Sequence, residues 1–172
     1  MPENVLLAGF GNTYRRDDGL GFTIVNALRR RLGRPVLDPL DDGFDDLGHA
    51  VDTVVLHQLV PELAETVAGY DLVIFVDAHV GSVPEEIRVM PLDVVFETPL
   101  VSHQFRPETV LALAQQMYDR APEGILLSVR GYDFEFGEGL SEPAAALVPE
   151  ALARIEALIE ARLPGLLLKR DS

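Results

Sequence analysis

The segment that most restricts the fold of this chain is residues 72–76, which are apolar at every position. A strand with one face in water alternates apolar and polar residues, whereas a continuous apolar run is typical of a strand covered on both faces in a parallel sheet. Residues 125–129 predict a second buried strand. Residues 87–90 alternate instead, which predicts an edge or antiparallel strand. The chain is therefore expected to place helices over both faces of a sheet.

Strand and helix patterns alternate along most of the sequence. Further strands are expected at 5–9 and 51–56, and helices at about 20–32, 59–68, 107–118 and 142–162. This order predicts an α/β fold, a three-layer α/β/α sandwich with a mostly parallel twisted sheet and right-handed crossovers. Because 172 residues with 48% hydrophobic composition can bury one core, we expect a single domain over 1–172, with a flexible tail at 163–172.

Residue spacing also predicts helix ends and buried faces. Asp17 or Asp18 is expected to cap the first helix and Gly33 to end it, while Ser141 caps the last helix. Residues 35–50 are rich in Asp, Gly and Pro and predict an exposed loop, with a weak strand at 36–37. The residues expected to face inward from the helices include Leu20, Ile24, Leu28, Leu32, Leu59, Leu63, Val67, Val110, Leu111, Ala114 and Met117.

Composition excludes several classes of protein. The formal net charge of −14 argues against nucleic-acid binding, because phosphate contacts need a cationic surface. The sequence has no apolar run long enough for a membrane span and no basic region before its first apolar run, so we expect a cytoplasmic protein without a membrane anchor. The absence of cysteine removes disulfides, Cys-based zinc sites and a cysteine nucleophile.

A glycine turn follows the first expected strand. Gly9 and Gly11 match the first two positions of a dinucleotide-binding fingerprint, but Tyr14 occupies the third, where a glycine lets helix and strand pack closely. No Lys-Ser or Lys-Thr pair follows, which excludes a phosphate-binding P-loop. Taken alone, the two glycines are equally well explained as a tight turn, so no nucleotide or other small-molecule cofactor is expected.

Carboxylates follow two of the expected parallel strands. Asp17 and Asp18 come after the glycine turn, and Asp77 comes directly after the apolar run at 72–76. One aspartate at a helix start is an ordinary cap, and a second can complement the helix dipole. Asp77 is costly to bury unless it is paired or bound to a metal. Because parallel strands end at one edge of the sheet, Asp18 and Asp77 are candidates for a shared site.

Three histidines are candidates to join this site. His103 lies in a loop before the helix at 107–118, whereas His57 and His79 each lie close after an expected strand. A single loop histidine is more often exposed and without a role. Two carboxylates and one imidazole together form a ligand set for a divalent metal.

Several segments together resemble the hydrogenase maturation proteases, which trim the C-terminal extension of the large subunit of nickel–iron hydrogenases after nickel insertion. The resemblance covers nearly the whole chain. The segments that carry it are residues 9–12, 17–19, 57–63, 73–78, 102–103 and 137–141. The segment at 35–50 looks longer than the family's usual connection after the first helix.

The resemblance implies an endopeptidase with a metal site of Asp18, Asp77 and His103, in which Asp18 and Asp77 are also the catalytic candidates. The metal would be nickel supplied by the substrate, and the partner would be the nickel-loaded hydrogenase large-subunit precursor. Two mechanisms stay open: the metal polarises the scissile carbonyl or activates a water, or a carboxylate acts as general base.

Other functions are compatible with the same residues. A non-catalytic maturation chaperone would use the same ligands to bind metal or client. A nucleotide or small-ligand binder is disfavoured by Tyr14 and by the missing P-loop lysine. A generic hydrolase stays open because a fold does not define a reaction.

Overall fold

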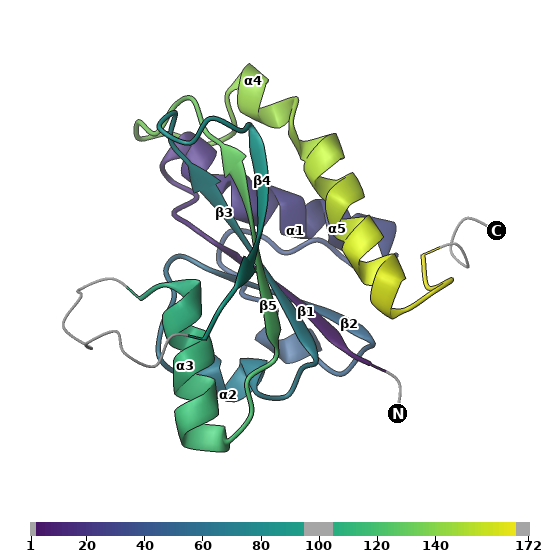
Figure 1. Ribbon diagram of the computed structural model, residues 1–172. Coiled ribbons are helices and arrows are strands. Elements are labelled where there is room, and N and C mark those ends of the chain that lie inside the picture. The colour runs from purple at the N-terminus through teal and green to yellow at the C-terminus, as the bar shows by residue number, and fades with distance from the viewer. Residues whose placement is uncertain (1–2, 95–104, 168–172) are drawn as a thin grey trace.

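The computed structural model describes residues 3–94 and 105–167, and five strands in this part of the chain form one sheet (Figure 1). The strands are β1 (Val5–Phe10), β2 (Val51–Leu56), β3 (Leu72–His79), β4 (Ile87–Leu92) and β5 (Glu123–Arg130). Their order is β2-β1-β3-β5-β4, and every neighbouring pair is parallel except β4 and β5. The predicted mostly parallel sheet with an antiparallel edge strand at 87–90 is confirmed.

Helices cover both faces of the sheet, which confirms the predicted three-layer sandwich (Figure 1). The helices are α1 (Leu20–Arg31), α2 (Leu63–Val67), α3 (Pro107–Tyr118), α4 (Glu142–Ala145) and α5 (Val148–Arg162). Helices α1, α4 and α5 pack on one face, and α2 and α3 on the other. No helix among the described residues is long and apolar enough to cross a membrane. The expected cytoplasmic location stays a prediction.

The apolar run in β3 explains why the sheet lies between two helical layers. Leu72, Ile74 and Val76 join the core under α1 and α5, while Val73 and Phe75 join the core under α2 and α3. Successive side chains of a strand point to opposite faces, so a strand without alternation is buried twice. Burying both faces stabilises the sheet by roughly 25 cal/mol for each Å² of apolar surface removed from water.

The start of α1 differs from the prediction. Neither Asp17 nor Asp18 caps α1: the two residues lie in the 3₁₀ turn η1 (Arg16–Gly19), and the N-cap is Gly19, with no side-chain bond. A carboxylate inside this turn is free to point elsewhere, which it does at both positions. The predicted helix end is confirmed, because Gly33 has a left-handed backbone conformation and its N–H donates to the carbonyl of Arg30.

Two other helices also differ from their predictions. α2 is shorter than the expected 59–68. Pro61 disfavours helical backbone at residue 60, and the N–H groups of residues 63–65 bond to the carbonyl three residues back, as in a turn, and not to the fourth. The expected helix at 142–162 is divided into α4 and α5, because Pro149 lies in the first turn of α5 and cannot continue the hydrogen bonds of α4. Met117, expected inside, is 63% exposed in the last turn of α3.

The chain after α5 packs back on the molecule as far as residue 167. Leu167 is buried in the core under α1 and α5, and its carbonyl accepts a hydrogen bond from Arg31. The tail expected from residue 163 therefore includes a packed segment, and residues 168–172 lie outside the described part.

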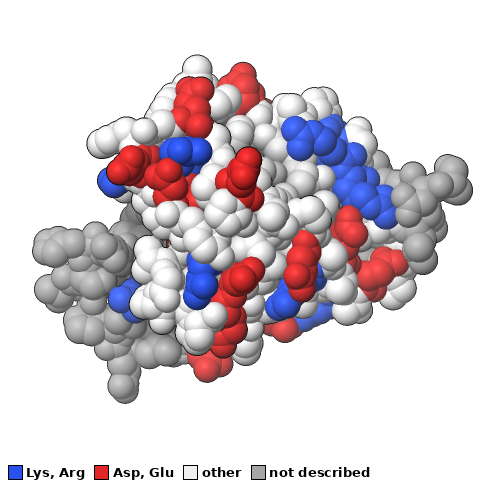
Figure 2. Space-filling view, turned by 90° about the horizontal axis from the view of Figure 1, so that it is seen from above, with Lys and Arg blue, Asp and Glu red and all other residues white. Residues whose placement is uncertain are grey.

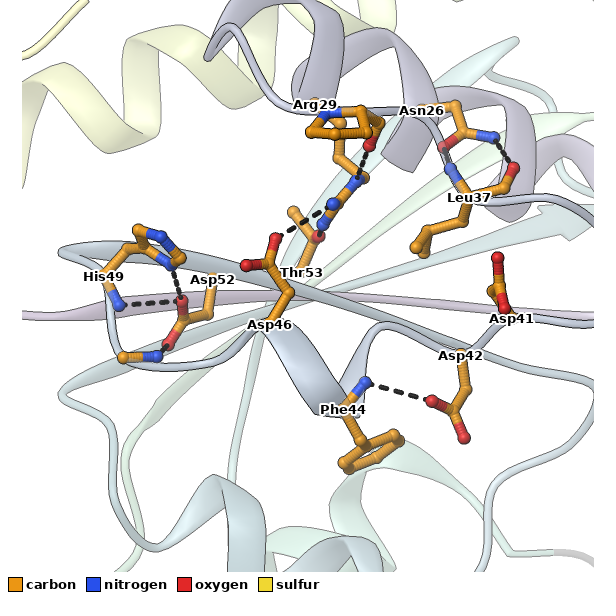
Figure 3. A network of polar contacts seen from close by, with 12 residues as sticks. Asn26, Arg29, Leu37, Asp41, Asp42, Phe44, Asp46, His49, Asp52 and Thr53 are labelled. Carbon is orange, nitrogen blue, oxygen red and sulfur yellow. Dashed lines mark hydrogen bonds and ion pairs between the residues drawn. The ribbon is translucent and has the colours of Figure 1, made fainter.

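Residues 35–50 are mostly exposed, as expected, but no strand forms at 36–37. Leu37 turns inward, and its backbone exchanges two hydrogen bonds with the side chain of Asn26 on α1. A second contact is made by Arg29, which is only 3% exposed. Its guanidinium donates to the carbonyl of Pro35, the hydroxyl of Thr53 and the carboxylate of Asp46 (Figure 3). One buried cation thus fastens this loop to α1 and β2.

Replacing Arg29 with Met should destabilise the protein by about 2–3 kcal/mol, because the three hydrogen bonds of a charged group are lost. Urea unfolding followed by circular dichroism measures the free energy of unfolding. Arg30→Met is the matched control, since Arg30 is the exposed neighbour on the same helix. Equal stability of the two variants would contradict the role of Arg29.

Candidate active site at the carboxyl edge of the sheet

A cavity of about 580 Å³ opens at the carboxyl edge of the parallel strands. Its lining comes from the end of β1, from the segments that follow β1 and β2, from β3 and β5, and from the start of α3. The lining residues are Phe10, Gly11, Asp18, His57, Gln58, Leu59, Asp77, Phe105, Arg106, Pro107, Glu108 and Leu126. The structure thus brings Asp18 and Asp77 to one cavity, 59 positions apart in sequence (77 minus 18).

Asp18 is held against the glycine turn. Its Oδ2 accepts the backbone N–H of Asn12 at 2.7 Å. Gly11 has φ +140°, and a Cβ there would lie 2.0 Å from the carbonyl oxygen of Asp18. Only glycine therefore allows the turn to approach Asp18 this closely.

Asp17, the neighbour of Asp18, has a different environment and is fully buried. Its carboxylate accepts four hydrogen bonds, from the backbone N–H groups of Tyr132, Asp133 and Ser141 and from the Ser141 hydroxyl. Burial alone would raise the pKa of Asp17, but the bonds from Ser141, Tyr132 and Asp133 outweigh it and lower that pKa. Asp17 is therefore an ionised structural anchor that ties the turn after β1 to the segment after β5.

Asp77 lies in β3 near its carboxyl end and is half-buried. Burial raises its pKa to about 7; the backbone N–H of Ala78 opposes this, and the negative charge of Asp18 adds to it. A carboxyl group with a pKa near neutrality can accept or donate a proton under physiological conditions. Such a perturbed group in a cavity is typical of a functional site.

The histidines differ in their availability. His103 lies outside the described residues. His57 is exposed, lines the cavity and stacks on Tyr14, with 6.1 Å between ring centroids. Both ring nitrogens of His79 are engaged, with the Ser128 hydroxyl at 2.9 Å and the Glu85 carbonyl at 2.8 Å. His79 is therefore not available as a ligand, whereas His57 is.

No group of three His, Cys, Asp or Glu side chains within residues 3–94 and 105–167 is arranged to hold a metal. In this part of the chain, Asp18 and Asp77 are the expected carboxylate ligands that share the cavity. The metal-binding and catalytic roles of Asp18, Asp77 and His103 stay predictions.

Two charged lining residues were not predicted. Arg106 and Glu108 stand on either side of Pro107, at the start of α3, and both line the cavity. The signal available in the sequence was Pro107 itself, because a proline in the first turn marks where a helix begins and places its neighbours at that end.

The close packing of α1 on β1 depends on a glycine that lies outside the dinucleotide-binding fingerprint. Gly21 on α1 replaces the absent third glycine: a Cβ there would lie 2.9 Å from both the Phe10 nitrogen and the Val76 carbonyl oxygen. The helix start therefore contacts β1 and β3 through backbone atoms, which brings η1 and Asp18 to the edge of the sheet.

Known structures with this fold include hydrogenase maturation endopeptidases. The hydrogenase maturating endopeptidase HybD from E. coli superposes with a TM-score of 0.66 at 21% identity, over 92% of this chain and 93% of that one. The hydrogenase 2 maturation peptidase from a Thaumarchaeota archaeon has a TM-score of 0.60 at 23% identity, over 91% and 98%. HybD from Thermococcus kodakarensis has a TM-score of 0.58 at 20% identity, over 91% and 99%.

This chain has the fold of the hydrogenase maturation endopeptidases. The resemblance that the sequence motifs indicated is thereby confirmed at the level of the fold. No protein-family model and no curated protein sequence matches the chain.

Asp17→Asn should destabilise the protein by about 2–4 kcal/mol, because an amide nitrogen would face groups that also donate. Asp18→Asn should cost less than about 1 kcal/mol, since its amide oxygen can still accept from Asn12. Thermal and urea unfolding of both variants measures the difference. Equal destabilisation would show that Asp17 is not the structural member of the pair.

Asp77 should make stability depend on pH. The pKa of Asp77 in the folded protein lies above the ordinary value near 4. The contribution of protonated Asp77 to the free energy of unfolding is therefore complete below about pH 4 and is lost as pH rises through about 7. Asparagine does not titrate, so the free energy of unfolding of Asp77→Asn should rise relative to that of wild type by about 1–3 kcal/mol between pH 4 and pH 8.

Urea unfolding at pH 4, 6 and 8, in buffer with EDTA, measures this gain. Asp45→Asn, which removes one carboxylate at an exposed position, is the control and is measured at the same three pH values. A constant difference between Asp77→Asn and wild type across this range would mean that Asp77 does not titrate near neutrality.

Proposed function

We propose that this protein is an endopeptidase that removes the C-terminal extension from the nickel-loaded large-subunit precursor of a nickel–iron hydrogenase. The observation that supports this most directly is the cavity that contains Asp18 and Asp77, at the carboxyl edge of a fold shared with hydrogenase maturation endopeptidases. Because one fold hosts many reactions, the two carboxylates carry more weight than the fold.

Nickel in this proposal belongs to the substrate. Asp18 and Asp77 would approach the metal of the precursor from the cavity, and His103 would be the third protein ligand. Carboxylate and imidazole are suitable donors for nickel, and a protein site with open positions can share a metal with ligands of the client. His57 is the alternative imidazole, because it lines the same cavity.

The two carboxylates are chemically unequal, which supports an acid–base role. With a pKa of about 7, Asp77 can accept a proton from an attacking water and return it to the leaving amine. The second mechanism, in which the bound metal polarises the scissile carbonyl, also needs Asp77 ionised, but as a ligand and not as the group that accepts the proton.

Purified protein should cleave a nickel-loaded hydrogenase large-subunit precursor and leave the nickel-free precursor intact, as followed by the mass of the C-terminus. Asp18→Asn and Asp77→Asn should each lower the cleavage rate at least about 100-fold if the carboxylate takes part in proton transfer. Circular dichroism of both variants confirms that they are folded.

His103→Ala and His57→Ala form a matched pair for the ligand assignment. Loss of processing by His103→Ala with full processing by His57→Ala supports His103, and the reverse result supports His57. Full processing by both aspartate variants would overturn the site. If the competent precursor binds in a nickel-dependent manner but keeps its extension, the protein is a maturation chaperone.

A further inference from the structure

Arg16 has a backbone conformation that residues other than glycine rarely adopt. Its φ is +43°, and among the described residues Arg16 and Asp119 are the two non-glycine residues with a positive φ. Asp119 ends α3, where a left-handed residue is common. Arg16 instead opens η1, directly before Asp17 and Asp18. Because this conformation costs free energy, it persists only where the surrounding structure holds it, and such residues are concentrated at functional sites.

Backbone hydrogen bonds hold the chain at and before Arg16. Its N–H donates to the carbonyl of Gly137 at 3.1 Å, and the N–H of Gly137 donates to the carbonyl of Tyr14 at 2.9 Å. Residues 14–16 therefore form a short parallel bridge with the segment that follows β5. The chain is thus fixed against this segment before the two aspartates begin.

The guanidinium of Arg16 binds the same segment at two further points. Nη1 donates to Oδ2 of Asp133 at 2.9 Å, and Nε donates to the carbonyl of Gly139 at 3.3 Å. Alanine at this position would keep the strained backbone without these bonds, whereas glycine would lose both the bonds and the strain. Arginine at a position that suits glycine therefore indicates that the guanidinium has a role of its own.

Asp133 connects Arg16 to the buried carboxylate of Asp17. The N–H of Asp133 donates to that carboxylate, and the carbonyl of Asp133 accepts the N–H of Asp17, both at 2.9 Å. The side chain of Asp133 accepts from Arg16 through Oδ2 and from the N–H of Glu135 through Oδ1. Arg16 thus stabilises the conformation of Asp133 in which its backbone makes both bonds to Asp17.

The orientation of Asp18 depends on these contacts, because Asp18 is the next residue of the same turn. Its N–H donates to the carbonyl of Arg15 at 3.0 Å, and its Oδ2 accepts from Asn12 at 2.7 Å. A rotation of the turn at Arg16 would move this carboxylate away from Asn12 and from the cavity. A misplacement of a reacting group by about 1 Å can lower a rate about 100-fold.

Charge alone does not explain the arginine at position 16. The side chains of Arg16 and Asp133 are 35% and 28% exposed, and an ion pair in contact with water contributes little to stability. On the face of the molecule seen from above, basic side chains lie next to acidic ones in several places (Figure 2). Charge pairs are therefore ordinary on this face, and what distinguishes Arg16 is its contact with the segment that anchors Asp17.

We propose that Arg16 is a positioning residue, which holds the carboxylate of Asp18 in the candidate active site through Asp133 and Asp17. Arg16 does not line the cavity, so it acts through these residues and not on the substrate. Its effect on precursor cleavage rests on the proposed function, whereas its effect on the position of Asp18 does not.

The backbone amide of Asn12 reports the position of Asp18, because it donates the 2.7 Å hydrogen bond to this carboxylate. A short bond to an ionised acceptor moves the amide proton downfield, and Asp18→Ala provides the reference for its loss. In ¹⁵N-edited spectra of the whole protein with EDTA, the Asn12 amide proton of Arg16→Ala should move at least about half of the way toward this reference. Arg154→Ala is the control, because it removes an arginine that pairs with Glu150 on α5, and it should leave the Asn12 amide unchanged.

Arg16→Gly separates positioning from stability. Glycine relieves the strain at φ +43°, so this variant should melt about 2–4 °C above Arg16→Ala. Both variants should nevertheless show the displaced Asn12 amide. Both should also cleave the nickel-loaded precursor about tenfold to 100-fold more slowly than wild type, with little change in KM, because the substrate still binds while Asp18 is misplaced. A purely structural arginine would instead let the more stable glycine variant regain the wild-type amide shift and rate.

Asp133→Ala tests the route of the effect. It should displace the Asn12 amide as Arg16→Ala does, and the double variant should add little further displacement, because the two residues act as one unit. Full additivity of the two displacements would exclude Asp133 as the link and would overturn the proposal.

A wild-type Asn12 amide in both Arg16→Ala and Arg16→Gly would also overturn it, as would full cleavage by both variants of a precursor that wild type cleaves. The spectra and the cleavage assay are independent, so the two proposals can fail separately. A displaced amide without cleavage by the wild-type protein rejects only the endopeptidase. Cleavage by the wild-type protein with an amide that no Arg16 variant displaces rejects only the positioning role.

Discussion

The candidate site depends on one buried carboxylate, that of Asp17. It accepts hydrogen bonds from Tyr132, Asp133 and Ser141, so the turn after β1 and the segment after β5 are held together at the carboxyl edge. Ser141 is also the N-cap of α4, whose first turn therefore starts from the same anchor. An ionised group with this many donors is stable inside a protein, because its hydrogen bonds replace those of water.

The same anchor explains how adjacent aspartates acquire different roles. In the tight turn of η1, Asp17 points into the protein, while Asp18 points toward Asn12 and the cavity. Once Asp18 is positioned, its charge contributes to raising the pKa of Asp77 across the cavity. One short turn thus supplies both the buried hydrogen bonds of Asp17 and the charge of Asp18 that acts on Asp77. Gly11 and Gly21 allow this turn to lie close against the sheet.

The fold was largely predictable because its strongest signals are local. A few neighbouring residues are enough to indicate a buried strand at 72–76, an edge strand at 87–90 and the end of a helix at Gly33. The errors occur where a local rule competes with another. Asp17 and Asp18 are both residue types that favour the N-cap position, yet neither caps α1. Hydrophobic spacing alone predicts one helix at 142–162, but Pro149 divides it.

By itself, the sequence determined the layered α/β fold and the edge at which Asp18 and Asp77 lie, since two-sided burial and strand order follow from residue pattern. Only the tertiary structure decided which aspartate is buried, which histidine is already bonded, and that Arg29 holds the loop at 35–50 against β2. The physical reason is that burial, pKa and hydrogen-bond partners depend on residues far apart in the chain. Such distances are set only when the layers pack.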